Sequence, residues 1–233
     1  MEEQNVIKSF EGSFLSEDKL NLAADVGDAA LDAALDSGAL DSIPILGLLK
    51  GAYTLTKNIQ TRRLCKKIVK FLYDSETISQ QDKDLFIKEY TDVNKERGAE
   101  VLLSVIDRLD NVNKVDVLAK IMKAKVNEQI SIIDFVRLSQ IIERLPYVDL
   151  QNLTKYKDDY TEIGTDDSLL AAGVIYESVM DLQNRSKYRL NYLGQILVKF
   201  GLDEIIEITQ SGVRSMPGAL SAHVEGNTLN PNS

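Results

Sequence analysis

The chain passes almost directly from its most apolar stretch into its most basic one. Residues 43–55 read IPILGLLKGAYTL, and residues 57–71 read KNIQTRRLCKKIVKF. Helical periodicity places the apolar side chains of residues 44–59 on one face, opposite Lys50. The same phase, continued past residue 60, would put lysines and arginines on that face. We therefore predict a break near Asn58–Thr61 with Thr61 as the new N-cap, or else a helix buried on different sides along its length.

The composition favours a helical fold. Aromatic residues make up 6% of the 233 residues and tryptophan is absent, so Leu, Ile, Val and Ala must fill the core. Three helix boundaries can be read directly: Gly38 as a C-cap, and Ser79 and Ser131 as N-caps. The helix after Ser131 should stop before Pro146.

A change of pattern marks the last third of the chain. TDDSLLAAGVIYESV predicts a helix capped by Thr165, with Gly173 leading into a short strand. A polar turn follows, and then YRLNYLGQILVKFGL predicts a second strand and a helix capped by Asn191. This order is that of a winged helix. The predicted fold class is mainly α, a multi-helix bundle with a small winged-helix-like β-hairpin near the C-terminus.

These patterns divide the chain into five predicted segments. They are an acidic N-terminal helical arm (1–41), an apolar-then-basic helical segment (42–75), a helical middle (76–130), a winged-helix-like domain (131–214) and a loose tail (215–233). No signal peptide or membrane span is recognisable, and the single cysteine suits a reducing compartment. The expected location is cytoplasmic, with peripheral contact at the inner membrane face as an option.

The charges are distributed unevenly. The net charge is −9, yet residues 42–73 contain seven basic residues and no acidic one. We call the following residues the basic segment: Lys57, Arg62, Arg63, Lys66, Lys67 and Lys70. Three interpretations stay open: the solvated face of a packed helix, a contact with an anionic membrane surface, or a contact with an acidic protein partner.

An acidic stripe precedes the basic segment. Asp25, Asp28, Asp32 and Asp36 are spaced to share one helical face. We hypothesise that this face docks on the basic segment and masks it until a signal separates the two. The alternative is an ordinary solvated helix face.

Catalysis and metal binding find little support in the sequence. The only histidine, His223, falls in the predicted tail, so nucleophilic catalysis lacks an ordered base. Cys65 lies beside Leu64 and Ile68, which favours a buried structural thiol. Zinc would need more His or Cys ligands than the chain has. We expect no enzyme activity, no cofactor and no metal.

DNA binding is disfavoured by charge. The helix ahead of the predicted wing reads TDDSLLAAG, with two acidic residues and no basic one, although in a winged helix it would enter the major groove. The wing offers only Arg185, Lys187 and Arg189. We therefore expect nucleic acid not to be the main partner.

The closing part of the chain carries a family resemblance. The residues concerned are Leu170, Gly173, Val174 and Ile175, followed by Tyr188, Arg189, Leu190, Leu193 and Gly194. This pattern resembles the Abi-alpha (abortive infection alpha) family of bacterial proteins, with Asn191 where the family usually has Thr. The resemblance implies a role in defence against phage and supplies no catalytic residues. The expected function is a non-catalytic interaction protein that works through protein contacts, self-association or a membrane surface; the alternative is a winged-helix transcriptional regulator.

Overall fold

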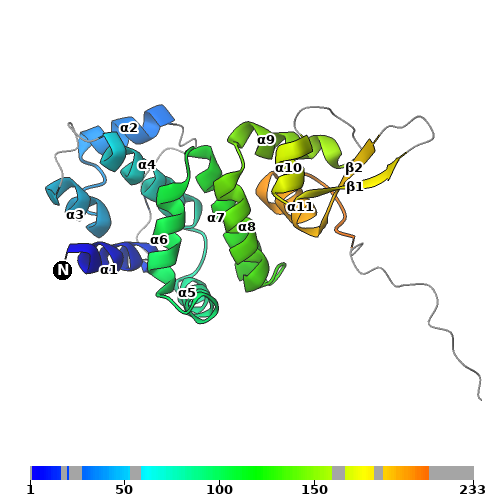
Figure 1. The fold of residues 1–233 in the computed structure, drawn as a ribbon. Coiled ribbons are helices and arrows are strands. Elements are labelled where there is room, and N and C mark those ends of the chain that lie inside the picture. Colours follow the sequence, from blue (N-terminus) through cyan, green and yellow to red (C-terminus); the bar gives the residue numbers. More distant parts are fainter. Residues whose placement is uncertain are drawn as a thin grey trace, which may run out of the picture.

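The computed structural model describes residues 2–16, 20, 28–52, 59–158, 166–180 and 186–209. The fold is mainly helical, with a small two-stranded antiparallel sheet near the C-terminus, as predicted (Figure 1). The elements, in chain order, are α1 (Glu2–Leu15), α2 (Asp28–Ser37), α3 (Pro44–Ala52), α4 (Ile59–Asp74), α5 (Gln80–Asn94), α6 (Gly98–Arg108), α7 (Asn113–Val126), α8 (Ile132–Arg144), α9 (Tyr147–Asn152), the 3₁₀ turn η1 (Leu153–Tyr156), α10 (Asp166–Ala171), β1 (Ile175–Met180), β2 (Ser186–Leu190), α11 (Tyr192–Ile196) and the π-helical turn η2 (Leu197–Gly201).

Among the residues described, no helix is both long enough and apolar enough to span a bilayer.

Helix α7 lies at the centre of the molecule. Helices α1–α6 gather at one end, while α9–α11 and the hairpin form the other (Figure 1). Helix α7 packs against α4, α5, α8 and η2, so it joins the two ends. Its buried residues, among them Val115, Leu118 and Met122, occur all round the helix, as expected of an element enclosed on every side.

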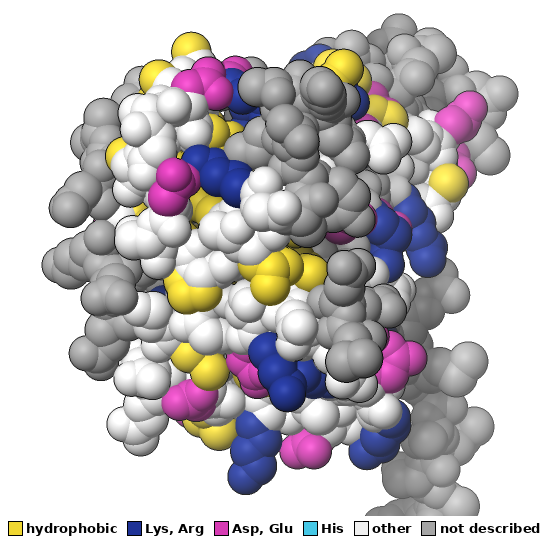
Figure 2. All heavy atoms as spheres, turned by 90° about the vertical axis from the view of Figure 1, so that its left-hand side faces the viewer, with side chains coloured by type: hydrophobic (Ala, Val, Ile, Leu, Met, Phe, Trp, Pro, Cys, Tyr) yellow, Lys and Arg dark blue, Asp and Glu magenta, His cyan; other side chains and the backbone are white. Residues whose placement is uncertain are grey.

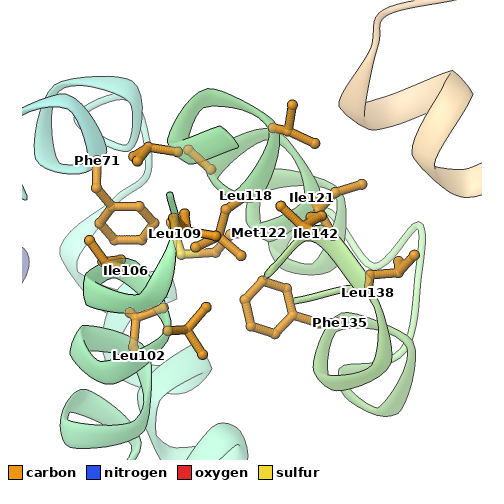
Figure 3. Close-up of a cluster of buried hydrophobic side chains, with 14 of the residues drawn as sticks. Phe71, Leu102, Ile106, Leu109, Leu118, Ile121, Met122, Phe135, Leu138 and Ile142 are labelled. Carbon is orange, nitrogen blue, oxygen red and sulfur yellow. The ribbon is translucent and has the colours of Figure 1, made fainter. Parts of the chain in front are cut away.

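The core around α7 is continuous (Figure 3). Leu118 and Met122 meet Leu102 and Ile106 on one side and Phe135 on the other (Figure 3). Phe135 also packs edge-on against the ring of Phe86, with centroids 5.0 Å apart. Burial of each such side chain contributes about 1.5–3 kcal/mol to the stability of the bundle.

The N-terminal helices belong to the same core. Phe10 and Phe14 of α1 are fully buried, and the ring of Phe14 lies 5.7 Å from that of Phe71 in α4. Leu31 and Leu35 of α2 are buried as well. In the part of the chain that the structure describes, segment 1–41 is therefore not a separate arm.

Several local predictions are confirmed. Ser79 caps α5 by accepting from the main-chain N–H of Asp82, and Ser131 forms a capping box with Asp134 at the start of α8. Gly38 follows α2 with a φ of 75°, in the left-handed region that favours glycine. Asn191 caps α11 by accepting from the N–H of Gly194.

The hairpin sits on α11 through a close backbone contact. Strands β1 and β2 pair in antiparallel register, with Ile175 opposite Leu190 and a bulge between Glu177 and Val179. The main-chain N–H of Asn191 donates to the carbonyl of Val174, and Gly194 lies directly against that same carbonyl. The order helix, strand, strand, helix is the one expected from the sequence.

At the apolar-to-basic junction, α3 is described as far as Ala52 and α4 from Ile59 onward, and Asn58, where the predicted break begins, lies outside the described residues. The cap prediction is wrong, because Thr61 lies inside α4 and is buried. Ile59 and Gln60 are already helical, so Thr61 cannot be the residue that caps this helix.

Candidate functional site

Helix α4 carries the described part of the basic segment, and its cations point in several directions. Arg62 and Lys66 contact α2, Lys67 contacts the end of α6 and the loop after it, and Lys70 contacts α4 itself and α7. Arg63 is exposed. The described cations of the segment are thus distributed around the helix and do not form one outward surface. Lys57 lies outside the described residues.

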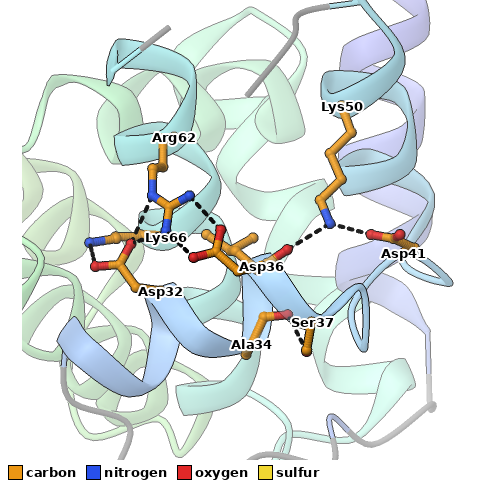
Figure 4. Close-up of polar contacts among 9 residues, drawn as sticks. Asp32, Ala34, Asp36, Ser37, Asp41, Lys50, Arg62 and Lys66 are labelled. Atoms are coloured by element: carbon orange, nitrogen blue, oxygen red, sulfur yellow. Dashed lines mark hydrogen bonds and ion pairs between the residues drawn. The ribbon is translucent and has the colours of Figure 1, made fainter. Parts of the chain in front are cut away.

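Arg62 and Lys66 are held by two carboxylates of α2 (Figure 4). The guanidinium of Arg62 donates from Nη1 and Nη2 to the two oxygens of Asp36, at 2.7 and 3.0 Å, and from Nε to Asp32 at 2.8 Å. Lys66 Nζ donates to the other oxygen of Asp32 at 2.6 Å. We call these four residues the α2–α4 clamp. Forked contacts of this kind are directional as well as attractive.

The clamp changes the proton affinity of its members. The hydrogen bond from Lys66, followed by that from Arg62, lowers the pKa of Asp32. The hydrogen bond from Arg62 lowers the pKa of Asp36. The two carboxylates in turn raise the pKa of Arg62 above its already high ordinary value. These shifts favour the charged forms of Asp32, Asp36 and Arg62 at neutral pH.

Helix α2 has further attachments to the bundle. Lys50 of α3 donates to the carbonyl of Leu35 at 3.0 Å and also to the carboxylate of Asp41 (Figure 4). Leu35 and Leu31 are buried beneath. Of the other predicted masking residues, Asp28 opens α2 and Asp25 lies outside the described residues.

Two lysines of the basic segment have structural roles. Lys67 is largely buried, and its ammonium donates to the main-chain carbonyls of Asp107 and Leu109. Lys70 donates to Asp74 at 2.6 Å and lies 3.8 Å from a carboxylate oxygen of Asp116. Both side chains are mostly buried, because α6 and α7 cover these sides of α4.

A groove runs between α4 and the loop that joins α6 to α7. Its volume is about 770 Å³, and we call it the α4 groove. The residues lining it are Gln60, Arg63, Lys66, Lys67, Asp107, Leu109, Asp110, Asn111, Val112 and Asn113. Lys66 therefore takes part in both the clamp and the groove. Sequence reasoning missed this site because residues 107–113 are distant from α4 along the chain.

Sequence reasoning also missed a set of buried lysines in the core. Lys114 is fully buried, pairs with Asp110 at 2.6 Å and donates to the carbonyl of Glu143. Lys83 lies over the ring of Phe14, 5.3 Å from its centroid. Helical periodicity does not predict buried lysines, since a lysine in an amphipathic helix normally lies on the solvent-exposed side.

The surface at the N-terminal end of the bundle is mixed in charge. Figure 2 shows lysine and arginine side chains interspersed with acidic ones there, around hydrophobic side chains near the centre. This agrees with the pairing of Arg62 and Lys66 to acids of α2.

The wing residues are only partly described. Arg185 lies outside the described residues, Lys187 is described only by its backbone pairing with Val179, and Arg189 is exposed on β2. In α10, Asp167 is exposed and Ser168 donates to Asp149 at 2.8 Å.

The residues singled out for catalytic or metal-binding chemistry can be placed as follows. No group of three or more His, Cys, Asp or Glu residues is arranged there to hold a metal ion. Cys65 is buried, as predicted, and burial raises the pKa of its thiol to about 11. His223 lies outside the described residues.

No protein-family model, curated protein or solved structure matches this chain.

Proposed function

We propose that this chain is an interaction protein that recognises an acidic segment of a partner protein through the α2 side of α4. The observation that carries the proposal is the α2–α4 clamp, in which Arg62 and Lys66 already bind carboxylates presented by a helix. Helix α2 then acts as an internal competitor, and a partner with a similar acidic helix replaces it.

The energetics of the clamp suit an exchangeable contact. The Arg62 and Asp32 side chains are 28% and 34% exposed, so water screens their attraction. Ion pairs of this type contribute about 0–1 kcal/mol each, which leaves the burial of Leu31 and Leu35 as the larger attachment of α2. A partner therefore has to replace the contacts of two leucines and two carboxylates of α2. An acidic amphipathic helix offers contacts of the same kinds, so it can exchange with α2.

An acidic protein suits this surface better than an anionic membrane. The apolar side of α4, including Cys65, Ile68 and Leu72, is packed in the core, so it is not available for insertion into a bilayer. The fork of Arg62 also matches two carboxylates at fixed positions, whereas a lipid surface offers diffuse charge.

The experiment uses a labelled peptide of residues 28–41, the acidic helix of this chain, as the acidic probe. Asp32→Asn with Asp36→Asn should weaken the internal competitor, so this double variant binds the peptide several-fold more tightly than the wild type. Asp92→Asn with Glu96→Gln is the matched control, since it removes the same charge from exposed positions on and just after α5. Arg62→Gln with Lys66→Gln should abolish binding.

Equal binding by the wild type and the Asp32/Asp36 variant would contradict the proposal. Two further binding assays use other probes. One uses vesicles that contain phosphatidylserine, and the other uses duplex DNA. Retention of the unmasked variant on vesicles without peptide binding would instead support the membrane interpretation and reject the one proposed.

A winged-helix DNA-binding regulator is the second candidate. The order α8, α9, α10, β1, β2 favours it. The acidic start of α10, with Asp166 and Asp167, weighs against it because phosphates would be repelled. Salt-dependent retention of the wild type on duplex DNA would support this candidate.

The role in phage defence stays a prediction from the family resemblance. A contact surface that is covered until a partner arrives is compatible with such a role. Phage challenge of cells that express the wild type or the Asp32/Asp36 variant would test it.

A further inference from the structure

The lining of the α4 groove has more positive than negative charge available to interact with a ligand. Arg63, Lys66 and Lys67 line it from α4, against Asp107 and Asp110. Asp110 pairs with Lys114, a residue that does not line the groove, at 2.6 Å. Lys66 is likewise paired with Asp32, at 2.6 Å, so Arg63 and Lys67 remain as the cations of the groove opposite Asp107.

Lys67 gives the groove a fixed positive charge. Its ammonium is held by the carbonyls of Asp107 and Leu109, which orient it without cancelling its charge. A carboxylate oxygen of Asp107 lies 3.8 Å from the ammonium, and the Asp107 side chain is 62% exposed. A cation that is oriented by main-chain oxygens and largely buried attracts an anion more strongly than a solvated lysine does.

The rest of the lining suits an organic ligand. Gln60, Asn111 and Asn113 carry amide groups that can donate and accept, and Leu109 and Val112 provide apolar surface. A volume of about 770 Å³ also falls within the range of small-molecule sites.

We propose that the α4 groove binds a small phosphorylated ligand. Arg63 and Lys66 contact the phosphate oxygens, Lys67 supplies the fixed charge beside them, and the amides and apolar side chains receive the remainder of the molecule. Arginine forks and lysine ammonium groups are the usual protein partners of phosphate.

Binding in the groove is coupled to the clamp through Lys66. Its ammonium donates to Asp32, so a phosphate that draws it into the groove weakens that contact. The ligand thus favours release of α2, and removal of Asp32 favours the ligand, by linkage. This coupling rests on the proposed function, whereas the ligand site itself does not.

Calorimetric titration of the full chain tests the site. The probes are pyrophosphate, ATP and inositol trisphosphate, with adenosine as the ligand that lacks phosphate; ATP and inositol trisphosphate distinguish a nucleotide from a lipid headgroup. We expect binding of at least one phosphorylated probe, weakened by salt, and none of adenosine. Arg63→Ala should weaken it about tenfold, while Arg137→Ala, an exposed arginine on α8, should not. Absence of binding by all three phosphorylated probes, or equal binding by both variants, would overturn the site.

The coupling has its own readout. Asp32→Asn should bind the same phosphorylated probe several-fold more tightly, and the probe should speed hydrogen exchange in α2 of the wild type. Unchanged affinity in Asp32→Asn would reject the coupling. Failure of every phosphate probe would leave the peptide experiment on the clamp unaffected, so the two proposals fail separately.

Discussion

The ammonium of Lys66 lies 2.6 Å from a carboxylate oxygen of Asp32, and the same side chain lines the α4 groove. One cation therefore borders two different surfaces of α4, one covered by α2 and the other open to solvent. This shared residue links the contact with α2 to the charge of the groove.

The pH dependence of the clamp follows from its lowered acid pKa values. Asp32 and Asp36 should titrate below their ordinary pKa of 3.8 in the folded chain. Their contribution to the docking of α2 is then complete above that ordinary value and is lost as the pH falls through the lowered values. Carboxyl-carbon NMR titration should show both midpoints moving upward in Arg62→Gln. Unchanged midpoints in that variant would contradict the clamp as the cause.

A buried acid in α4 should give the opposite pH dependence. One oxygen of Asp74 accepts from Lys70, while the other is buried without a hydrogen-bond partner. Burial raises its pKa above the ordinary 3.8, so the folded chain holds the proton more tightly than the unfolded chain does. Stability should consequently fall as the pH rises from the ordinary value through the raised one. Asp74→Asn should reduce this slope in urea unfolding between pH 4 and pH 8, unlike Asp92→Asn on the exposed side of α5. An identical slope in wild type and Asp74→Asn would count against this account.

The contact between the hairpin and α11 can be tested with two glycines. A β-carbon at Gly194 would lie 2.0 Å from the carbonyl oxygen of Val174, so Gly194→Ala forces the two backbones apart. We expect a loss of about 3 kcal/mol or more in the free energy of unfolding. Gly12→Ala is the control, since a β-carbon on this exposed helical residue meets nothing within 4 Å. It should stabilise the chain by about 0.5–1 kcal/mol. Similar changes in the free energy of unfolding for both substitutions would contradict the close contact between Gly194 and Val174.

The burial of Cys65 predicts slow alkylation of the folded chain. Burial raises the pKa of its thiol to about 11, and the reactive species is the thiolate. At pH 8 iodoacetamide should modify the native chain at least roughly a hundredfold more slowly than the chain in denaturant, given an ordinary thiol pKa near 8.5. The rate is followed by intact mass. Comparable rates in the two states would show that Cys65 is accessible.

Much of the local structure could be predicted because it depends on nearby residues. Ser79 and Ser131 reach main-chain groups three residues away, and Gly38 adopts its φ of 75° just after a helix. The hairpin could be located for the same reason, from Gly173 at its start and Asn191 at its end. The N-cap predicted at Thr61 from the change in helical phase is wrong, because Thr61 lies inside α4.

The direction of each charged side chain could not be predicted in the same way. Periodicity placed the cations of α4 on one face, but α2, α6 and α7 pack on different sides of α4 and each receives different ones. Lys67 is buried because main-chain carbonyls at the end of α6 satisfy its ammonium, and no local pattern marks those carbonyls. The spacing of the acidic stripe predicted that its aspartates share one face of a helix. Of these, Asp32 and Asp36 contact Arg62 in α4.

By itself, the sequence determined the helical character of the fold, the caps at Ser79, Ser131 and Asn191, the hairpin and the separation of acidic from basic segments, because each of these is set by interactions within a few residues. The tertiary structure alone decided which cations are neutralised, which are buried and which border a groove. The physical reason is that the free energy of a charge depends on its surroundings, and residues distant in the sequence supply most of those surroundings.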